Sequence, residues 1–210
     1  MPTITKLERQ KKNTSRISVF VDGEFAFGVH EQVALKYFLK SGMELPADLR
    51  RKLEYDETIS EARIVAERYL ARSMRTEKEV RTRLREKDFR QEIIDIVVEA
   101  LLRDHLLDDA RYAEAFIRSA QRLKPRSRQK LLIDLRKKGV AEETARAALE
   151  EAEEPIDDSE TAELIAAKYV ATHKGVEPEK LKRRLFGYLQ RRGFRAGDIF
   201  PAIRSVLEND

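Results

Sequence analysis

The sequence predicts a mainly α-helical protein: tandem three-helix repeats in an elongated array, preceded by a small N-terminal β-hairpin module. Three observations predict this fold. A basic motif occurs three times with a period of about 50 residues, charged residues make up 38% of the 210-residue chain, and an Asp-Gly pair near the N-terminus separates two alternating apolar runs. A period of this length is typical of stacked helical units, and a high charge content fits thin units with much solvated surface.

The N-terminal module is expected over residues 1–57. Residues 16–21 and 24–29 flank Asp22-Gly23 with alternating apolar side chains, which is a strong hairpin signal. Residues 3–9 can supply the third strand that an isolated hairpin needs for stability.

A helix is expected after the hairpin, from Glu31 to Lys40, ending at Gly42. Pro46 predicts the start of a turn-rich connection over residues 45–58. The rest of the chain then divides into three repeats, expected at residues 58–107, 108–153 and 158–210.

Each repeat begins with a helix whose small, aliphatic and aromatic residues share one face at i, i+3, i+4 spacing. The second helix of each repeat carries an apolar pair and is otherwise mostly polar. The face residues are Ala66, Tyr69 and Leu70, then Ala113, Phe116 and Ile117, then Ala166, Tyr169 and Val170; the pairs are Val80 with Leu84, Leu131 with Leu135, and Leu185 with Leu189.

The ends of the second helices are marked by specific residues. Thr76 and Glu79 form a capping-box pattern at the start of the first, and Pro178 suits the first position of the third. Gly139 and Gly193 suit a left-handed terminator. Asp88 stands at that position in repeat 1 and tolerates the conformation less well than glycine.

The third helices carry the broadest apolar faces, so they are expected to be the most buried of each repeat. Proline is compatible with a helix only in its first turn. We therefore expect the last helix to start near Asp198, so that Pro201 falls in the first turn. The faces consist of Ile93, Ile94, Val97, Val98, Leu101 and Leu102, then Ala145, Ala148 and Leu149, then Ile199, Ala202, Ile203 and Leu207.

Composition excludes several classes of protein. The chain has no cysteine, which excludes disulfides and thiolate metal sites. It has no 18-residue apolar run and no signal peptide, so we expect a cytoplasmic protein without a membrane segment. It has no glycine-rich phosphate loop, no paired metal-ligand histidines and no nucleophile elbow. We therefore expect no enzyme activity and no cofactor.

Positive charge is concentrated although the net charge is only +4. Residues 116–140 hold nine Lys/Arg and one Asp, and residues 180–195 hold seven Lys/Arg and no acid. These bases lack balancing acids at i+4, and a polyanion would relieve their mutual repulsion. By contrast, residues 150–160 hold seven acids, which is typical of a linker or a solvated helix end.

The expected DNA- or filament-binding residues lie on the second helices and on the segments before them, while the third helices are acidic. Such a distribution favours sequence-tolerant contacts with the backbone of single- and double-stranded DNA over base readout. Tyr188 and Phe186 could stack on a base, although helix packing explains them better. The expected contact residues are Arg81, Arg85, Lys87, Lys124, Arg126, Arg128, Lys130, Arg136, Lys137, Lys138, Lys182, Arg183, Arg184, Arg191 and Arg192.

The chain resembles the RecX family of bacterial recombination regulators. The resemblance rests on the run at residues 106–113, Leu-Leu-Asp-Asp-Ala-Arg-Tyr-Ala, on the basic turns, and on residues 69–72 followed by residues 75–79. It covers residues 58–207, and the hairpin is similar to that of longer members. Asp88 and His105 stand where the family often has glycine, and both residue types tolerate left-handed backbone.

The resemblance implies a modulator of the RecA recombinase, acting in DNA recombination, repair and the SOS response. We also expect the protein to be a monomer. Members of the family bind along the RecA–DNA filament and limit its growth, its ATP hydrolysis and strand exchange. A repeat array would offer a long surface to such a filament.

Two other functions fit the same helices. One is a sequence-specific helix-turn-helix repressor, which would select a consensus site from random duplexes. The other is a protein-interaction scaffold whose basic residues only solvate it, and which would bind neither bare DNA nor RecA filaments through them.

Overall fold

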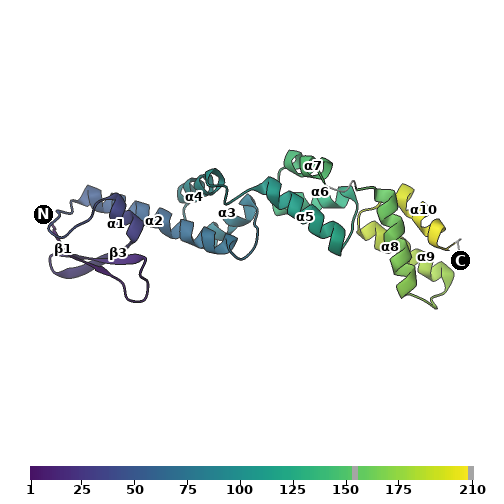
Figure 1. Cartoon of the computed structure of the whole chain (residues 1–210), viewed down its shortest axis with the longest axis horizontal. Helices are drawn as coiled ribbons and strands as arrows, with labels where there is room; N and C mark the ends of the chain where they lie inside the picture. The colour runs from purple at the N-terminus through teal and green to yellow at the C-terminus, as the bar shows by residue number, and fades with distance from the viewer. Residues whose placement is uncertain (153–155, 208–210) are drawn as a thin grey trace. The chain divides into compact units, whose positions relative to one another are not determined.

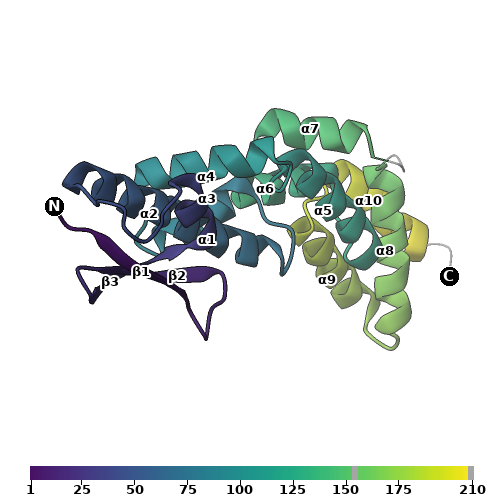
Figure 2. The same ribbon diagram turned by 60° about the vertical axis from the view of Figure 1, so that its left-hand side comes forward.

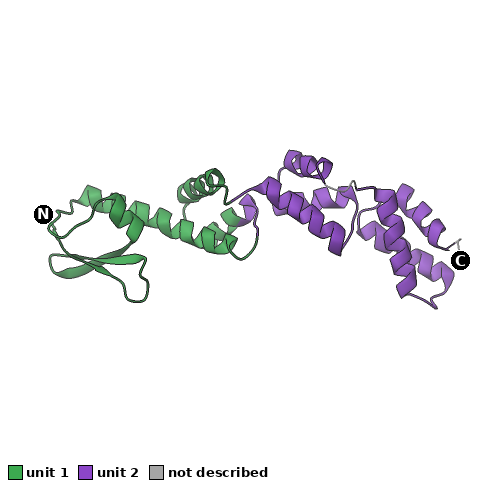
Figure 3. Cartoon of the chain, viewed as in Figure 1, with its two compact units in different colours: residues 1–73, 80–106 green, residues 74–79, 107–210 purple. Residues whose placement is uncertain are grey.

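The computed structural model describes residues 1–152 and 156–207, which form three strands and ten helices. The chain divides into two compact units (Figure 3): residues 1–73 with 80–106, and residues 74–79 with 107–210. The boundary between the units therefore falls within one helix of repeat 1. The mainly helical class with a small N-terminal sheet is confirmed. The part of the expected acidic linker at residues 153–155 lies outside the described residues.

The N-terminal sheet (Figure 1) consists of β1 (Ile4–Arg9), β2 (Arg16–Val21) and β3 (Glu24–His30). Its strands are antiparallel and pair in the order β1-β2-β3. Asp22 and Gly23 have φ angles of 51° and 91°, so both adopt the positive φ that a tight hairpin turn of type I′ requires. The hairpin and its third strand are confirmed.

Two helices cover this sheet, as Figure 2 shows: α1 (Glu31–Lys36) and α2 (Ala47–Leu70). The helix α1 is shorter than predicted, because Phe38 adopts a left-handed φ of 50°. The prediction of a turn-rich connection over residues 45–58 is wrong. Pro46 is the N-cap of the 24-residue α2, whose Leu53 is fully buried in the core of the sheet module. Tertiary packing thus extends the helix through a segment that its sequence marks as turn-rich.

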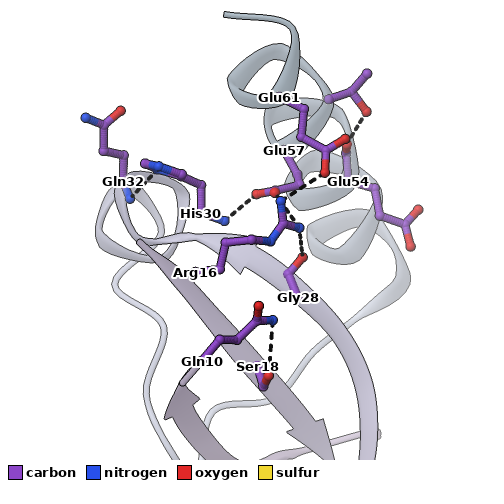
Figure 4. A network of polar contacts seen from close by, with 10 residues as sticks. Gln10, Arg16, Ser18, Gly28, His30, Gln32, Glu54, Glu57 and Glu61 are labelled. Carbon is purple, nitrogen blue, oxygen red and sulfur yellow. Dashed lines mark hydrogen bonds and ion pairs between the residues drawn. The ribbon is translucent and has the colours of Figure 1, made fainter. Parts of the chain in front are cut away.

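A polar network joins the sheet to α2 (Figure 4). The guanidinium of Arg16 lies 2.9 Å from the carboxylate of Glu57 and 3.0 Å from that of Glu61, and donates to the carbonyl of Gly28. The backbone N–H of His30 donates to Glu57 at 2.5 Å. Glu57 is 8% exposed, and its burial raises the pKa of its carboxyl group above the ordinary value. This network fixes α2 against β2 and β3.

Repeat 1 consists of α2, α3 (Glu77–Arg85) and α4 (Gln91–Arg103). The capping box is confirmed: the Glu79 N–H donates to Thr76 Oγ1 at 3.2 Å, and the Thr76 N–H donates to the Glu79 carboxylate at 3.3 Å. The apolar face of α4 is buried except for Leu102, which is 40% exposed.

Repeats 2 and 3 have the same order of three helices. In repeat 3, α8 and α10 lie side by side in both Figure 1 and Figure 2. Each of these two repeats has its own buried apolar core. The helices are α5 (Asp109–Leu123), α6 (Arg128–Lys138), α7 (Glu142–Glu150), α8 (Asp158–Thr172), α9 (Pro178–Arg191) and α10 (Ala196–Leu207).

The last helix begins two residues earlier than predicted, so Pro201 lies inside α10 and not in its first turn. The carbonyl of Arg195 accepts the N–H groups of both Asp198 and Ile199 at 3.0 Å. The first turn is therefore already closed before the proline is reached. Ile199, Ala202 and Ile203 are buried, and this packing offsets the backbone hydrogen bond that proline cannot donate.

The successive repeats are joined by a buried hydroxyl group. The Oγ1 of Thr76 donates to the carbonyl of Lys138, and the Oγ of Ser127 donates to the carbonyl of Gly193, both at 2.7 Å. Thr76 and Ser127 are each 0% exposed. Each hydroxyl belongs to the N-cap of one repeat's second helix and contacts the C-terminal end of the next repeat's second helix.

A pair of aspartates completes each joint. Asp108 caps α5 by accepting the N–H groups of Ala110 and Arg111, while Asp109 accepts the N–H of Glu77 at 2.9 Å. We call the two joints, centred on Thr76 with Asp109 and on Ser127 with Asp158, the hydroxyl joints.

Repeat 3 begins with an equivalent pair of aspartates, Asp157 and Asp158. Asp157 caps α8, and Asp158 accepts the N–H of Arg128 at 2.8 Å. Of the two interpretations of the acidic run, a linker or a helix end, the helix end fits these two residues, because they cap and begin α8. They correspond to Asp108-Asp109, and the preceding apolar residues, Leu107 and Ile156, are both buried.

Candidate nucleic-acid interface

The structure brings five of the expected contact residues and one tyrosine around a single hollow of about 260 Å³. Repeat 2 contributes the segment before α6 and the first turn of that helix, and repeat 3 contributes the end of α9. The lining residues are Lys124, Arg126, Lys130, Tyr188, Arg191 and Arg192. We call this hollow the basic hollow.

Among the residues that the structure describes, one carboxylate forms ion pairs with these cations. Asp134 lies 2.6 Å from the Arg126 guanidinium and 2.8 Å from the Lys130 ammonium. Burial alone would raise the pKa of the Asp134 carboxyl, but hydrogen bonds from Lys130 and Arg126 hold it below the ordinary value. The prediction that the bases lack acids at i+4 is therefore wrong for Lys130. The i,i+4 spacing of Lys130 and Asp134 in the sequence could have revealed this ion pair.

Arg192 is held in place by groups from both repeats. It donates to the carbonyl of Pro125 at 2.8 Å and to the hydroxyl of Tyr188 at 2.6 Å. Its guanidinium carbon also lies 4.5 Å from the centre of the Tyr188 ring. The fold thus fixes the position of Arg192, and within the described residues no carboxylate takes part.

The two aromatic residues of α9 pack against other side chains. The Tyr188 ring lies 4.7 Å from that of Tyr169, in addition to its contact with Arg192. The Phe186 ring lies 5.5 Å from that of Phe200. These contacts favour the packing interpretation over base stacking.

A second group of bases lies on α9. Lys182, Arg183 and Arg184 are exposed, and no ion pair involves them in the part of the chain that the structure describes. We call these three residues the α9 row. Arg184 is four residues before Tyr188 and seven before Arg191, so these three share one helix face.

Most expected contact residues of repeat 1 and the remainder of repeat 2 are paired with acids. Arg81 lies 2.5 Å from Asp95, Arg128 lies 2.5 Å from Glu150, Lys138 lies 2.8 Å from Glu79, and Arg136 pairs with Glu142. Arg85 donates to the amide oxygen of Gln91, and Lys87 and Lys137 are exposed.

Three of these four ion pairs have the same arrangement. In each, a base on the second helix of a repeat contacts an acid on the third helix of that repeat. Sequence spacing within one helix does not reveal such a pair, because its members lie on different elements. Among the expected contact residues that have no ion pair in the described parts of the chain, most therefore lie in repeat 3 or line the basic hollow.

Other site types are not found in the described residues. Within residues 1–152 and 156–207, no group of three or more His, Asp or Glu side chains is arranged to hold a metal ion. Within the same ranges, no helix combines the length and hydropathy needed to cross a bilayer.

Sequence profiles of one family match most of the chain in four parts. They are described as the regulatory protein RecX N-terminal domain, at residues 2–46, and as the first, second and third three-helix domains of RecX, at residues 62–101, 108–149 and 157–203.

Curated relatives span the whole chain. A regulatory protein RecX of Leuconostoc mesenteroides is 32% identical, covering 100% of this chain and 78% of the relative. That of Bacillus subtilis is 31% identical, covering 100% and 80%. That of Clostridium acetobutylicum is 29% identical, covering 99% and 98%.

Two solved structures share the fold. A crystal structure of regulatory protein RecX superposes with a TM-score of 0.78 at 23% identity over 100% of both chains. RecX from Lactobacillus salivarius gives a TM-score of 0.61 at 24% identity, over 72% of this chain and 97% of that one.

Proposed function

Because the chain belongs to the RecX family of regulatory proteins, we propose that it is a non-catalytic regulator that binds the RecA–DNA filament. In this proposal it limits filament growth, ATP hydrolysis and strand exchange, and so acts in recombination, repair and the SOS response. It works as a cytoplasmic monomer and needs no cofactor.

The observation that carries the proposal is the gathering of five cations from two repeats around the basic hollow. A concentration of like charge is stabilised by a polyanion, and DNA in a filament presents one. The α9 row adds three more cations on the same helix as Tyr188 and Arg191. Such side chains contact phosphates and carry little sequence information.

The test is the ATPase activity of RecA on single-stranded DNA, with this protein added at substoichiometric ratios. We expect the rate to fall, because a regulator that limits filament growth lowers the number of RecA subunits assembled on the DNA. A rate that stays constant up to a stoichiometric ratio would refute the proposal.

Two further measurements separate the other candidate functions. Selection on random duplexes should give no consensus, since the contacts are directed to the backbone; a strong consensus would favour the repressor. Co-sedimentation with RecA filaments and with bare DNA should show binding to both. A protein that sediments with neither would fit the scaffold.

A further inference from the structure

The basic hollow carries more positive charge than its own residues neutralise. Five cations line it, and Asp134 is the carboxylate paired with two of them, so five minus one leaves a surplus of four positive charges. Groups held this close repel one another, and an anion in the hollow would remove the repulsion.

The cations divide into two kinds. Arg126 and Lys130 are bound to Asp134, and Arg192 is bound to Pro125 and Tyr188. Lys124 and Arg191 are exposed, and in the described residues their side chains make no hydrogen bond or ion pair. Three cations therefore shape the hollow, and two remain available to a ligand.

From this arrangement we infer that the basic hollow binds one phosphodiester group of a nucleic-acid strand, with Lys124 and Arg191 as its direct donors. The inference rests on the proposed function and assigns the contact to particular residues. Arginine suits the planar pair of phosphate oxygens, and lysine acts as a point charge beside it.

The chemistry of the lining favours phosphate over a base. The Tyr188 ring is already in contact with Arg192 and Tyr169, and no asparagine or glutamine lines the hollow to recognise a base edge. The site should therefore accept any sequence.

The charge along α9 favours a polymer over a free phosphate ion. Arg184 lies on the helix face that Tyr188 and Arg191 share, and it has no ion pair in the described part of the chain. A strand seated in the hollow can place its next phosphates along this face, whereas a single ion gains nothing from it.

The experiment compares the full chain with the double variant K124A/R191A. Binding of a fluorescent oligothymidylate is measured by anisotropy over a range of salt concentrations. We expect binding to weaken roughly tenfold or more. The slope of log K against log salt should become shallower by about 0.7 for each phosphate that the variant no longer neutralises. An abasic strand of equal length should show the same weakening.

The matched control is R118A/K168A. It removes one arginine and one lysine from exposed positions in repeats 2 and 3, outside the basic hollow. The change in net charge is identical, so we expect affinity and salt slope near those of the unchanged protein. An equal weakening in both variants would show that only net charge matters and would overturn the inference.

The remaining outcomes are decisive too. Unchanged binding by K124A/R191A would overturn the inference, as would binding of inorganic phosphate as tight as that of the oligonucleotide. If the unchanged protein fails to affect RecA while K124A/R191A loses oligonucleotide binding, only the proposed function fails. If RecA is inhibited while K124A/R191A binds normally, only the inference fails.

Discussion

The turn residue after each second helix has the same backbone conformation in all three repeats, but the space around it differs between repeats. Asp88, Gly139 and Gly193 all have left-handed φ angles, of 61°, 98° and 87°. A Cβ atom at Gly139 would clash with the side-chain carbons of Lys78, and one at Gly193 would lie 2.6 Å from Cβ of Lys130. Asp88 is exposed. Glycine is therefore needed for space as well as for backbone conformation at the two joints.

Alanine substitution should separate these two requirements. Gly139→Ala combines left-handed strain with a backbone-proximal clash, and we expect it to lower the free energy of unfolding by roughly 2 kcal/mol or more. Asp88→Ala changes an exposed residue that already bears a Cβ, so we expect a decrease below about 1 kcal/mol. Urea denaturation followed by circular dichroism measures both, and equal decreases would contradict the packing role of Gly139.

At this scale the sequence predicted conformation but not contacts. Positive φ at Asp88, Gly139 and Gly193, and at His105, followed from residue type and from their place after a helix. The approach of Lys78 to Gly139 joins residues 61 positions apart. No local pattern encodes such a contact, and the same is true of the ion pairs of Arg81, Arg128 and Arg136, whose acids lie on another helix.

At the scale of elements, each hydroxyl joint connects neighbouring repeats through backbone groups. The N–H of Glu77 or Arg128 donates to Asp109 or Asp158 of the following repeat. Burial raises the pKa of both carboxyl groups above the ordinary aspartate value of 3.8, against the lowering effect of the backbone hydrogen bond. The joints therefore contain carboxylates that are costly to keep charged.

The raised pKa values fix the sign of a pH effect. The folded protein binds these protons more tightly than the unfolded chain, so this stabilisation is complete below pH 3.8 and is lost as pH rises through the folded value. Asn at position 109 keeps the acceptor and removes the charge. We expect Asp109→Asn to be at least as stable as the unchanged protein at pH 7 and to lack this part of the pH dependence.

Asp109→Ala provides the comparison, because it removes the carboxylate oxygen that accepts the Glu77 N–H. We expect it to be less stable than Asp109→Asn by about 1–3 kcal/mol. Thermal unfolding from pH 3 to pH 8 measures all three proteins. A neutral-pH stability of Asp109→Asn that falls to that of Asp109→Ala would show that the charge itself is required.

Helices and strands could be predicted from the sequence where the local motifs agreed with one another. They could not be predicted where a single residue type, such as proline, suggested a different structure. The hairpin, the capping box and the Pro178 helix start followed from short motifs. Pro46 suggested a turn, but the core around Leu53 determines the helix. The aspartate pair at residues 157–158 was hidden by the surrounding acids, although its match to residues 108–109 could have been found by aligning the buried apolar residues that precede both pairs.

At the scale of the whole molecule, α2 belongs to two cores. Its N-terminal half buries Leu53 with the sheet, and its C-terminal half carries the buried residues Ala62 and Ala66. The same helix also packs against α4. The sheet module and repeat 1, apart from residues 74–79, therefore lie in one compact unit. Sequence motifs at the two ends of α2 do not show that a single helix connects them.

Glu57 offers a test of this coupling. Glu57→Ala leaves Arg16 without one carboxylate and the His30 N–H without its acceptor, so we expect a destabilisation of roughly 3 kcal/mol. Hydrogen exchange should quicken in α4 as well as in β3, because both depend on α2. The control is Glu54→Ala, which removes an exposed pair with Arg50 and should cost less than about 1 kcal/mol. Faster exchange in β3 alone would show that the two cores are independent.

The hydroxyl joints also give the array a direction. Thr76 and Ser127 point a donor toward the repeat that follows, whereas the N-cap of α9, Glu177, turns its carboxylate oxygens back onto the amides of Glu179 and Lys180. A second copy of repeat 2 inserted after the first would carry both groups that a hydroxyl joint needs: the carbonyl that accepts the hydroxyl of the preceding repeat, and the serine that donates to the following one. A repeat grafted behind repeat 3 would meet a self-satisfied end and would need serine or threonine in place of Glu177.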